Sequence, residues 1–293
     1  MPELPEVETV RRGLAPYLEG ARIEKVTLNR KDLRFPFPQG LAKALTGQTI
    51  ESVGRRAKYL LLRLSGGATL LSHLGMTGSY RFIDFSFKEP SRYYEPDQDE
   101  KHDHLRLDLI HPRHGKLSLV YNDARRFGFI DLFTDAAESP YLSGLGPEPL
   151  SNAFNAEEMA ERFRGKKAPI KAALLDQRVV AGLGNIYVSE ALHRAHIRPE
   201  VEARTLVLKS GAASKRLEGL ATGVRAVLTE AIEAGGSTLR DFRDANGGSG
   251  YFQHRFAVYD REGEPCPTPG CKGVIRRIVQ SGRSTFFCPV CQR

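Results

Sequence analysis

Four cysteines near the end of the chain constrain its fold more than any other feature. Four residues separate Cys266 from Cys271, and after sixteen more residues Cys288 and Cys291 follow with two between them. Two such pairs can surround one Zn²⁺ with thiolates, and a site closed by four thiolates is structural. A disulfide framework is typical of small secreted domains. Because these cysteines cluster at the end of a chain with the features of a cytoplasmic protein, they favour metal binding. The runs at 274–279 and 284–287 predict a β-hairpin between the pairs.

The net charge is +8, and it is unevenly distributed. Residues 1–150 hold 21 Lys and Arg against 20 Asp and Glu, whereas residues 151–293 hold 22 against 15. Residues 266–293 hold five basic residues and no acidic one. A basic half suggests a polyanionic partner, most simply nucleic acid. A solvated basic face would give the same charge balance, and charge alone does not decide between them.

The length of 293 residues suggests two domains, at roughly 150 residues per domain. Hydrophobic residues make up 41% and charged residues 27%, the balance of a globular protein. The chain has no run of about 18 apolar residues, so we expect no transmembrane helix. The first residues carry Glu3, Glu6 and Glu8 and lack the apolar stretch of a secretory signal, which favours a cytoplasmic protein.

The apolar pattern changes along the chain. Residues 5–18 predict a helix, and residues 21–133 predict an all-β sandwich or barrel of short strands. Residues 84–104 are polar and predict a long exposed loop, and 144–149 predict a linker. Later helices are expected at 156–164, 169–180, 186–195, about 203–210 and 214–234.

Glycines join the helices expected at 169–180 and 186–195. We expect Asn185 to be the N-cap of the second helix, whose free backbone amides can bind phosphate. An ordinary capped helical hairpin explains the same pattern, and this segment alone favours that simpler interpretation.

Pro2 follows the initiator Met1, which is commonly removed before a small residue. Removal would expose a secondary amine that can attack a carbon and form a covalent iminium intermediate. Glu3 and Glu6 could move protons beside it. Acidic residues at a helix start explain the same pattern, and without further context that explanation is preferred.

Motifs in a fixed order along the whole chain supply that context. They are MPELPEVETVRRGL at the start, RRAKYLLL at 55–62, HLGMTG at 73–78, DARRFG at 123–128, LGPEPL at 145–150, LLDQRVVAGLGNIYVSEAL at 174–192, GGSTLRDF at 235–242 and GYFQHRFAVYDREGEPC at 250–266. The sequence resembles the bacterial formamidopyrimidine-DNA glycosylases, which remove 8-oxoguanine and ring-opened purines from duplex DNA. Each motif alone is weakly or moderately specific, whereas their joint order is very specific.

The resemblance implies an α+β fold of three parts and a linker. These are an N-terminal β-sandwich with a leading helix (1–134), the linker (135–150), a helix–two-turn–helix domain (151–250) and a zinc-finger β-hairpin (251–293). It also implies one structural Zn²⁺, a monomer that binds damaged double-stranded DNA and no membrane, and a location at the bacterial chromosome in the cytoplasm.

The resemblance assigns catalytic roles to five residues. Pro2 would attack C1′ of the damaged nucleoside and leave a Schiff base to the sugar. Glu3 would be the proton donor and Glu6 a supporting carboxylate. Lys58 would bind phosphate and assist β-elimination, and Arg283 at the hairpin tip would hold phosphate and assist δ-elimination. Taken alone, Lys58 would be a surface lysine on a strand.

The resemblance also assigns DNA contacts. Met76, Arg125 and Phe127 would fill the gap left by the flipped nucleotide, although composition alone would place Met76 and Phe127 in the core. The phosphate contacts would be His102, Arg125, Lys166 and Asn185, with Arg126 and His73 as weaker candidates. Residues 237–250, rich in glycine, match the family's mobile loop over the flipped base.

Two departures from the family pattern stand out. The first cysteine pair has four intervening residues where many members have two, and the acidic stretch at 84–100 is longer than usual. A non-catalytic DNA-binding module would need no free N-terminal amine, so Pro2, Glu3 and Lys58 together favour the enzyme. A related endonuclease VIII-like enzyme for oxidised pyrimidines is the other alternative, and the PELPEVET start with Met76, Arg125 and Phe127 resembles the purine-directed branch instead.

Overall fold

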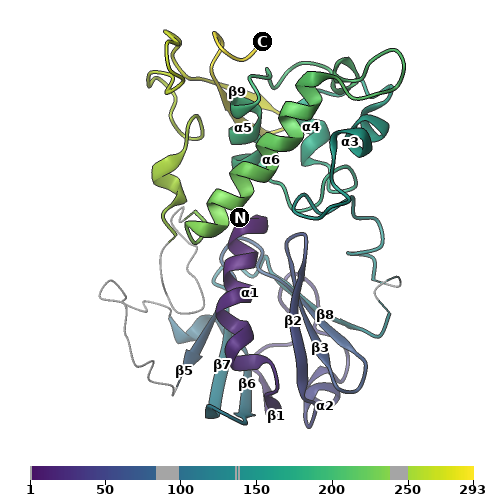
Figure 1. Cartoon of the computed structure of the whole chain (residues 1–293). Helices are drawn as coiled ribbons and strands as arrows, with labels where there is room; N and C mark the ends of the chain where they lie inside the picture. The colour runs from purple at the N-terminus through teal and green to yellow at the C-terminus, as the bar shows by residue number, and fades with distance from the viewer. Residues whose placement is uncertain (1, 84–98, 136, 138, 238–249) are drawn as a thin grey trace. The chain divides into compact units, whose positions relative to one another are not determined.

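The computed structural model describes all residues except 1, 84–98, 136, 138 and 238–249. The chain forms two compact units (Figure 1). The first comprises Met1–Ser143 and Ala234–Tyr251, and the second comprises Gly144–Glu233 and Phe252–Arg293. Among the described residues, no helix has the length and apolar character needed to cross a membrane.

The first unit consists of a leading helix followed by two antiparallel four-stranded sheets. Its elements are α1 (Leu4–Leu18), β1 (Arg22–Leu28), α2 (Leu41–Leu45), β2 (Ile50–Arg56), β3 (Tyr59–Leu64), β4 (Thr69–His73), β5 (Ser79–Ile83), the 3₁₀ turn η1 (Glu100–His102), β6 (Asp103–His111), β7 (Gly115–Asn122) and β8 (Phe129–Phe133). One sheet has the order β1-β6-β7-β5 and the other the order β2-β3-β4-β8. The predicted leading helix and β-sandwich are confirmed.

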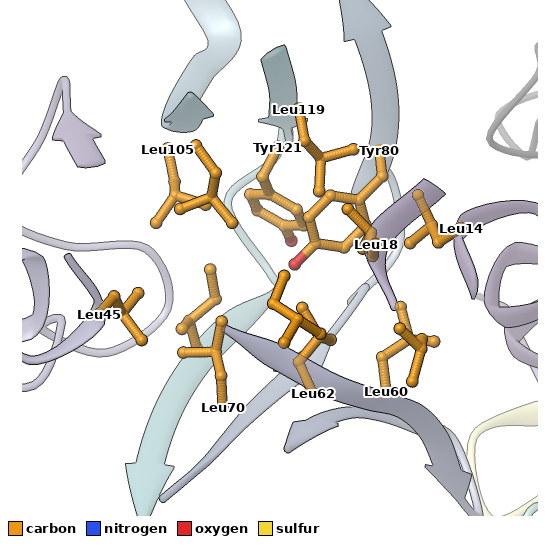
Figure 2. Close-up of a cluster of buried hydrophobic side chains, with 14 of the residues drawn as sticks. Leu14, Leu18, Leu45, Leu60, Leu62, Leu70, Tyr80, Leu105, Leu119 and Tyr121 are labelled. Atoms are coloured by element: carbon orange, nitrogen blue, oxygen red, sulfur yellow. The ribbon is translucent and has the colours of Figure 1, made fainter. Parts of the chain in front are cut away.

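One apolar core joins α1 and both sheets (Figure 2). Along β3 the buried residues alternate with outward ones, so Leu60, Leu62 and Leu64 face the core. Helix α1 contributes Leu14 and Leu18, which are spaced one turn apart. Burying one leucine side chain contributes roughly 1.5–3 kcal/mol, so this core fixes the position of the helix that Pro2 and Glu3 directly precede.

The end of the predicted loop at 84–104 is ordered, and there the prediction of an exposed loop is wrong. Residues 84–98 lie outside the described part, but Glu100–His102 form η1 and Asp103 begins β6. Asp103 is half-buried, and Arg81 donates two hydrogen bonds to its carboxylate, at 2.7 and 2.6 Å. Asn122 donates to the same carboxylate at 2.7 Å.

The second unit is helical and ends in a β-hairpin. Its elements are α3 (Ala156–Phe163), α4 (Ile170–Leu175), α5 (Asn185–Arg194), the 3₁₀ turn η3 (Ala203–Leu206), α6 (Lys215–Glu233), the 3₁₀ turn η4 (Phe252–Arg255), β9 (Arg276–Gln280) and β10 (Arg283–Phe287). Strands β9 and β10 pair antiparallel, which confirms the predicted hairpin.

Two predicted helices of this unit are shorter than expected. Helix α4 ends at Leu175 because Asp176 is extended and accepts hydrogen bonds from the backbone N–H groups of Arg178 and Val179. The segment expected at about 203–210 forms only the turn η3, since Val207 is extended and bridges to Ala213.

Candidate functional site

The residues at the start of α1 are buried. Pro2 and Glu3 are buried, and the backbone N–H of Glu3 donates to Glu6 Oε2 at 2.8 Å. Glu6 is 2% exposed, and its Oε1 accepts hydrogen bonds from Ser237 N–H at 2.8 Å and Ser237 Oγ–H at 2.9 Å. Gly236 approaches so closely that an added Cβ would lie 3.2 Å from Glu6 Cγ. The structure therefore brings Pro2, Glu3 and Glu6 together.

Lys58 lies in the turn between β2 and β3 and is only 7% exposed, so it is not a surface lysine. Its neighbour Ala57 has a φ of +52°, a conformation that costs free energy outside glycine. Arg55 holds this turn against α1, because it donates to the Ala57 carbonyl at 2.8 Å and pairs with Glu8 at 3.3 Å. The turn that carries Lys58 is thus tied to the helix that follows Pro2.

Glu8 is a buried carboxylate for which the sequence predicts no functional role. Burial opposes its ionisation, but hydrogen bonds from Arg11 and Arg12 and the charge of Arg55 outweigh it, so its pKa falls to about 2. The spacings of three and four residues from Glu8 to Arg11 and Arg12 are helix-neighbour spacings that could have revealed these pairs.

Two loops of the first unit present the residues predicted to fill the DNA gap. Phe127 is 45% exposed, and the Arg125 guanidinium lies 4.7 Å from the centre of its ring. Met76 is half-buried in the loop after β4. The expectation from composition that Phe127 lies in the core is therefore wrong.

Close packing holds these two loops against each other. An added Cβ on Gly75 would lie 2.3 Å from the backbone nitrogen of Gly128, so only glycine fits there. Asp123 is fully buried and accepts hydrogen bonds from Thr77 Oγ1 at 2.5 Å and Gly128 N–H at 2.8 Å. Arg125 N–H donates to Thr77 Oγ1 at 3.0 Å. One buried carboxylate thus links the loops, although sequence patterns gave no sign of it.

The three remaining candidates of this unit lie in different surroundings. His102 is half-buried in η1, and its carbonyl accepts a hydrogen bond from Asp123 N–H at 3.0 Å. Arg126 is exposed with a φ of +55°. His73 stacks on Phe129 with ring centres 5.1 Å apart. Burial lowers the pKa of His73 to about 4, so its ring is neutral near pH 7 and carries no charge for a phosphate.

In the second unit, side chains from two helices hold β10 next to Arg283. Lys171 on α4 donates to the Ser284 carbonyl at 2.9 Å and to Thr285 Oγ1 at 2.6 Å. Asn185 Nδ2 donates to the same Ser284 carbonyl at 2.9 Å. Arg283 itself is exposed at the hairpin turn, as predicted.

Asn185 is not the N-cap of α5, and that prediction is wrong. The extended residue Gly184 occupies the cap position, and Asn185 is the first helical residue. Its side chain is directed to Ser284 instead of the helix amides, because the hairpin supplies a carbonyl acceptor there.

Lys166 follows α3 in a turn whose backbone is fixed on both sides. Its N–H donates to Phe163 O at 3.0 Å, and its carbonyl accepts from Arg204 N–H at 3.0 Å. The side chain is half-buried.

The four cysteines converge as their spacing predicts. Their Sγ atoms all lie within 4.8 Å of one another. The Sγ atoms of Cys266 and Cys291 are 3.7 Å apart, and those of Cys271 and Cys288 are 3.6 Å apart. A tetrahedral zinc ion with sulfur at about 2.3 Å requires sulfur–sulfur separations of about 3.8 Å. Four thiolates at these distances fit Zn²⁺.

Three family models together cover most of the chain. Residues 1–130 match "Formamidopyrimidine-DNA glycosylase N-terminal domain", residues 145–243 match "Formamidopyrimidine-DNA glycosylase H2TH domain", and residues 263–293 match "Zinc finger found in FPG and IleRS". A formamidopyrimidine-DNA glycosylase of Rhodopseudomonas palustris (strain BisA53) is 57% identical over 297 residues, which cover 100% of both chains.

Two solved structures are similar along the whole chain. The MutM (Fpg) protein of Thermus thermophilus is 41% identical with a TM-score of 0.80, and the match covers 99% of this chain and 98% of that one. The Lactococcus lactis Fpg in complex with DNA containing an abasic site is 36% identical with a TM-score of 0.81, and the match covers 100% of each.

Proposed function

The chain belongs to the formamidopyrimidine-DNA glycosylase family, and on that basis we propose how its own side chains carry out the reaction. It is a bifunctional DNA glycosylase and AP lyase of base excision repair, which excises oxidised purines from duplex DNA and cleaves the strand. The observation that carries the assignment of roles is the enclosed start of α1, where Pro2, Glu3 and Glu6 are buried together.

Pro2 is the nucleophile in this proposal. Once Met1 is removed, its secondary amine attacks C1′ of the damaged nucleoside, and the bond from C1′ to the base breaks. Glu3 donates the proton that the reaction needs as the base leaves. The Pro2 nitrogen loses its own proton, the bond from C1′ to the ring oxygen breaks and that oxygen takes up a proton, so an iminium bond between Pro2 and the opened sugar remains. Glu6 supports both residues, since it accepts the Glu3 N–H and thereby fixes the first turn of α1.

Two cations assist the elimination steps in this proposal. Loss of a proton from C2′ of the iminium expels the 3′ phosphate, and a further elimination expels the 5′ phosphate. Lys58 binds phosphate near the lesion and assists the first step. Arg283 holds phosphate and assists the second, which its exposed position at the hairpin turn supports.

The remaining candidates hold the DNA. Flipping a nucleotide out of the duplex costs roughly a few kcal/mol and leaves a gap. Met76 and Phe127 enter this gap as apolar wedges, and Arg125 hydrogen-bonds the unpaired cytosine. Phosphates are contacted by His102, Lys166, Asn185 and Arg126. His73 stays the weaker candidate, because its ring packs against Phe129 and is neutral near pH 7.

One structural zinc ion is the cofactor, and we propose the four cysteines as its ligands. When bound, zinc supplies folding free energy to the hairpin and takes no part in the chemistry. We also propose the division at 1–134, 135–150, 151–250 and 251–293, a monomer without membrane association, and action on the bacterial chromosome in the cytoplasm. Residues 238–249 of the expected mobile loop lie outside the described residues.

Borohydride trapping tests the assignment of Pro2. The purified protein, with its N-terminus confirmed by mass, is incubated with an 8-oxoguanine:cytosine duplex and borohydride, which reduces the iminium to a stable adduct. We expect an adduct with the native protein. A matched protein with one extra residue before Pro2 should bind the duplex but give neither adduct nor cleavage. Cleavage by the extended protein would refute the role of Pro2, and binding by both proteins without an adduct would favour a non-catalytic module or another lesion.

A further inference from the structure

The longer first cysteine pair places a hydroxyl group beside the metal site. Thr268 is one of the four residues between Cys266 and Cys271. Its Oγ1 lies 3.4 Å from Cys266 Sγ and 3.8 Å from Cys291 Sγ. This segment therefore brings a hydrogen-bonding group to the sulfur atoms of Cys266 and Cys291.

A histidine from helix α5 reaches the same two cysteines. His193 is only 6% exposed, and its Nε2 lies 3.4 Å from Cys266 Sγ and 3.9 Å from Cys291 Sγ. The same Nε2 lies 3.3 Å from Thr268 Oγ1. One imidazole nitrogen, one hydroxyl and two sulfur atoms thus form a single buried or half-buried group.

Zinc binding fixes the direction of these hydrogen bonds. A zinc-bound cysteine is a thiolate, and its sulfur can only accept. The Nε2 atom must then carry the proton, and it can donate to Cys266 directly or to Thr268, whose hydroxyl in turn donates to sulfur.

We propose that His193 and Thr268 donate hydrogen bonds to the zinc-bound thiolates of Cys266 and Cys291 and so bind the metal site to helix α5. Four thiolates on Zn²⁺ carry a net charge of −2, and donors to sulfur stabilise that charge. They also slow the loss of a ligand from the metal, because a hydrogen-bonded thiolate leaves the site less readily.

The position of His193 on α5 gives this contact a wider role. Asn185 at the first turn of the helix holds the Ser284 carbonyl beside Arg283. Glu190 in the middle accepts backbone hydrogen bonds from Ala257, Val258 and Tyr259 at 2.8 to 3.0 Å. His193 makes a third contact from the last turn, so helix α5 contacts the zinc-finger segment at its first turn, its middle and its last turn. His193 and Thr268 are positioning residues, since they act through the zinc ligands.

Zinc release from the full-length protein tests the proposal. The parent is first checked for one zinc per chain, and release to an excess of a chromogenic chelator is then timed. We expect His193→Leu to release zinc about tenfold faster, in line with the effect of removing groups that orient metal ligands. His193→Gln keeps a donor N–H at a similar reach and should stay closer to the parent. The control His196→Asn alters an exposed histidine on the same segment, in a residue type that tolerates its φ of +54°.

A second pair of variants keeps the test interpretable even if His193→Leu fails to fold. Thr268→Val should accelerate release, whereas Thr268→Ser keeps the hydroxyl and should not. In the cobalt-substituted protein, the sulfur-to-metal charge-transfer band should shift in His193→Leu and Thr268→Val, and in neither control. Parental release rates and unshifted bands in both variants would overturn the proposal, and so would a parent that binds no zinc. Because neither readout requires DNA cleavage, a failure here is distinguishable from a failure of the Pro2 assignment.

Discussion

The β-sandwich and the zinc finger hold their functional residues by different means. The sandwich gathers buried side chains from α1, α2 and all eight strands into one apolar core. The buried apolar cluster of the finger consists of Val258, Cys266, Ile275, Phe286 and Cys288, so two of its members are predicted zinc ligands. A module of this size cannot stabilise itself by apolar burial, and the metal supplies what the core lacks.

The difference extends to the residues that each region presents. In the sandwich, the loops of Met76 and Phe127 are fixed by backbone contact and by the buried carboxylate of Asp123. In the finger, the strand of Arg283 is fixed by Lys171 and Asn185 from neighbouring helices. Loss of the zinc ion should therefore destabilise the finger and spare the sandwich, and a cavity in the apolar core should do the reverse.

Loss of zinc should give the largest effect. Cys288→Ser removes one ligand, and structural zinc contributes on the order of 10 kcal/mol to the folding of small zinc modules. We expect zinc content and DNA affinity to fall together, while hydrogen exchange in 263–293 becomes fast and exchange in β3 and β7 stays slow. Protected amides in 263–293 without metal would contradict the division between the two regions.

The matched change in the sandwich is Leu119→Ala. Leu119 lies in the core on β7, and truncation of a buried leucine costs about 2–5 kcal/mol. Denaturant unfolding should show this loss, and zinc content should remain at one per chain. A fall in zinc content would mean that the finger depends on the sandwich for its fold.

A smaller effect is expected for Asp123→Asn. The substitution removes a charge that accepts from Thr77 and Gly128, and such a change costs about 1–3 kcal/mol. Excision of 8-oxoguanine from a duplex should slow more than cleavage at a preformed abasic site, where no base has to be extruded. The control Asp108→Asn alters a carboxylate paired with Arg106 on β6, and equal effects of both variants would contradict a role in holding the loops.

The last effect is visible only as a change with pH and concerns the acid stability of the sandwich. The folded-state pKa of Glu8 is about 2, below its ordinary value of 4.5. Its ionised form therefore stabilises the fold above pH 4.5, and this contribution is lost as the pH falls from 4.5 towards 2. The difference in free energy of unfolding between the parent and Glu8→Gln should shrink over that interval. A difference independent of pH would show that folding does not lower the pKa of Glu8.

Local patterns predicted much of the fold. The leading helix, the short strands, helix α6 and the cysteine hairpin follow from periodicity and spacing within a few residues. The errors arise where distant residues compete for local groups. Asn185 is directed to Ser284, 99 positions away, and this partner cannot be inferred from the sequence around the helix.

The candidate site divides in the same way. The cysteines are identified by spacing alone, and their convergence is confirmed. The residues that hold the site, such as Asp123 and His193, were not identified, because their partners lie on other elements and their burial is a property of the fold. The roles of Pro2, Glu3, Lys58 and Arg283 stay predictions that the experiments above address.

The close packing of Gly75 against the backbone of Gly128 has a consequence for how such an enzyme can diverge. The frame of the two loops is built from glycines and a buried aspartate, while the side chain of Phe127 projects out of it. If Phe127 enters the DNA as proposed, substitutions at this exposed position would change the contact with the DNA at little cost in stability. Substitutions at Gly75, Gly128 or Asp123 would instead destabilise both loops, so the proposed lesion contact can change at the tip only while this packing is kept.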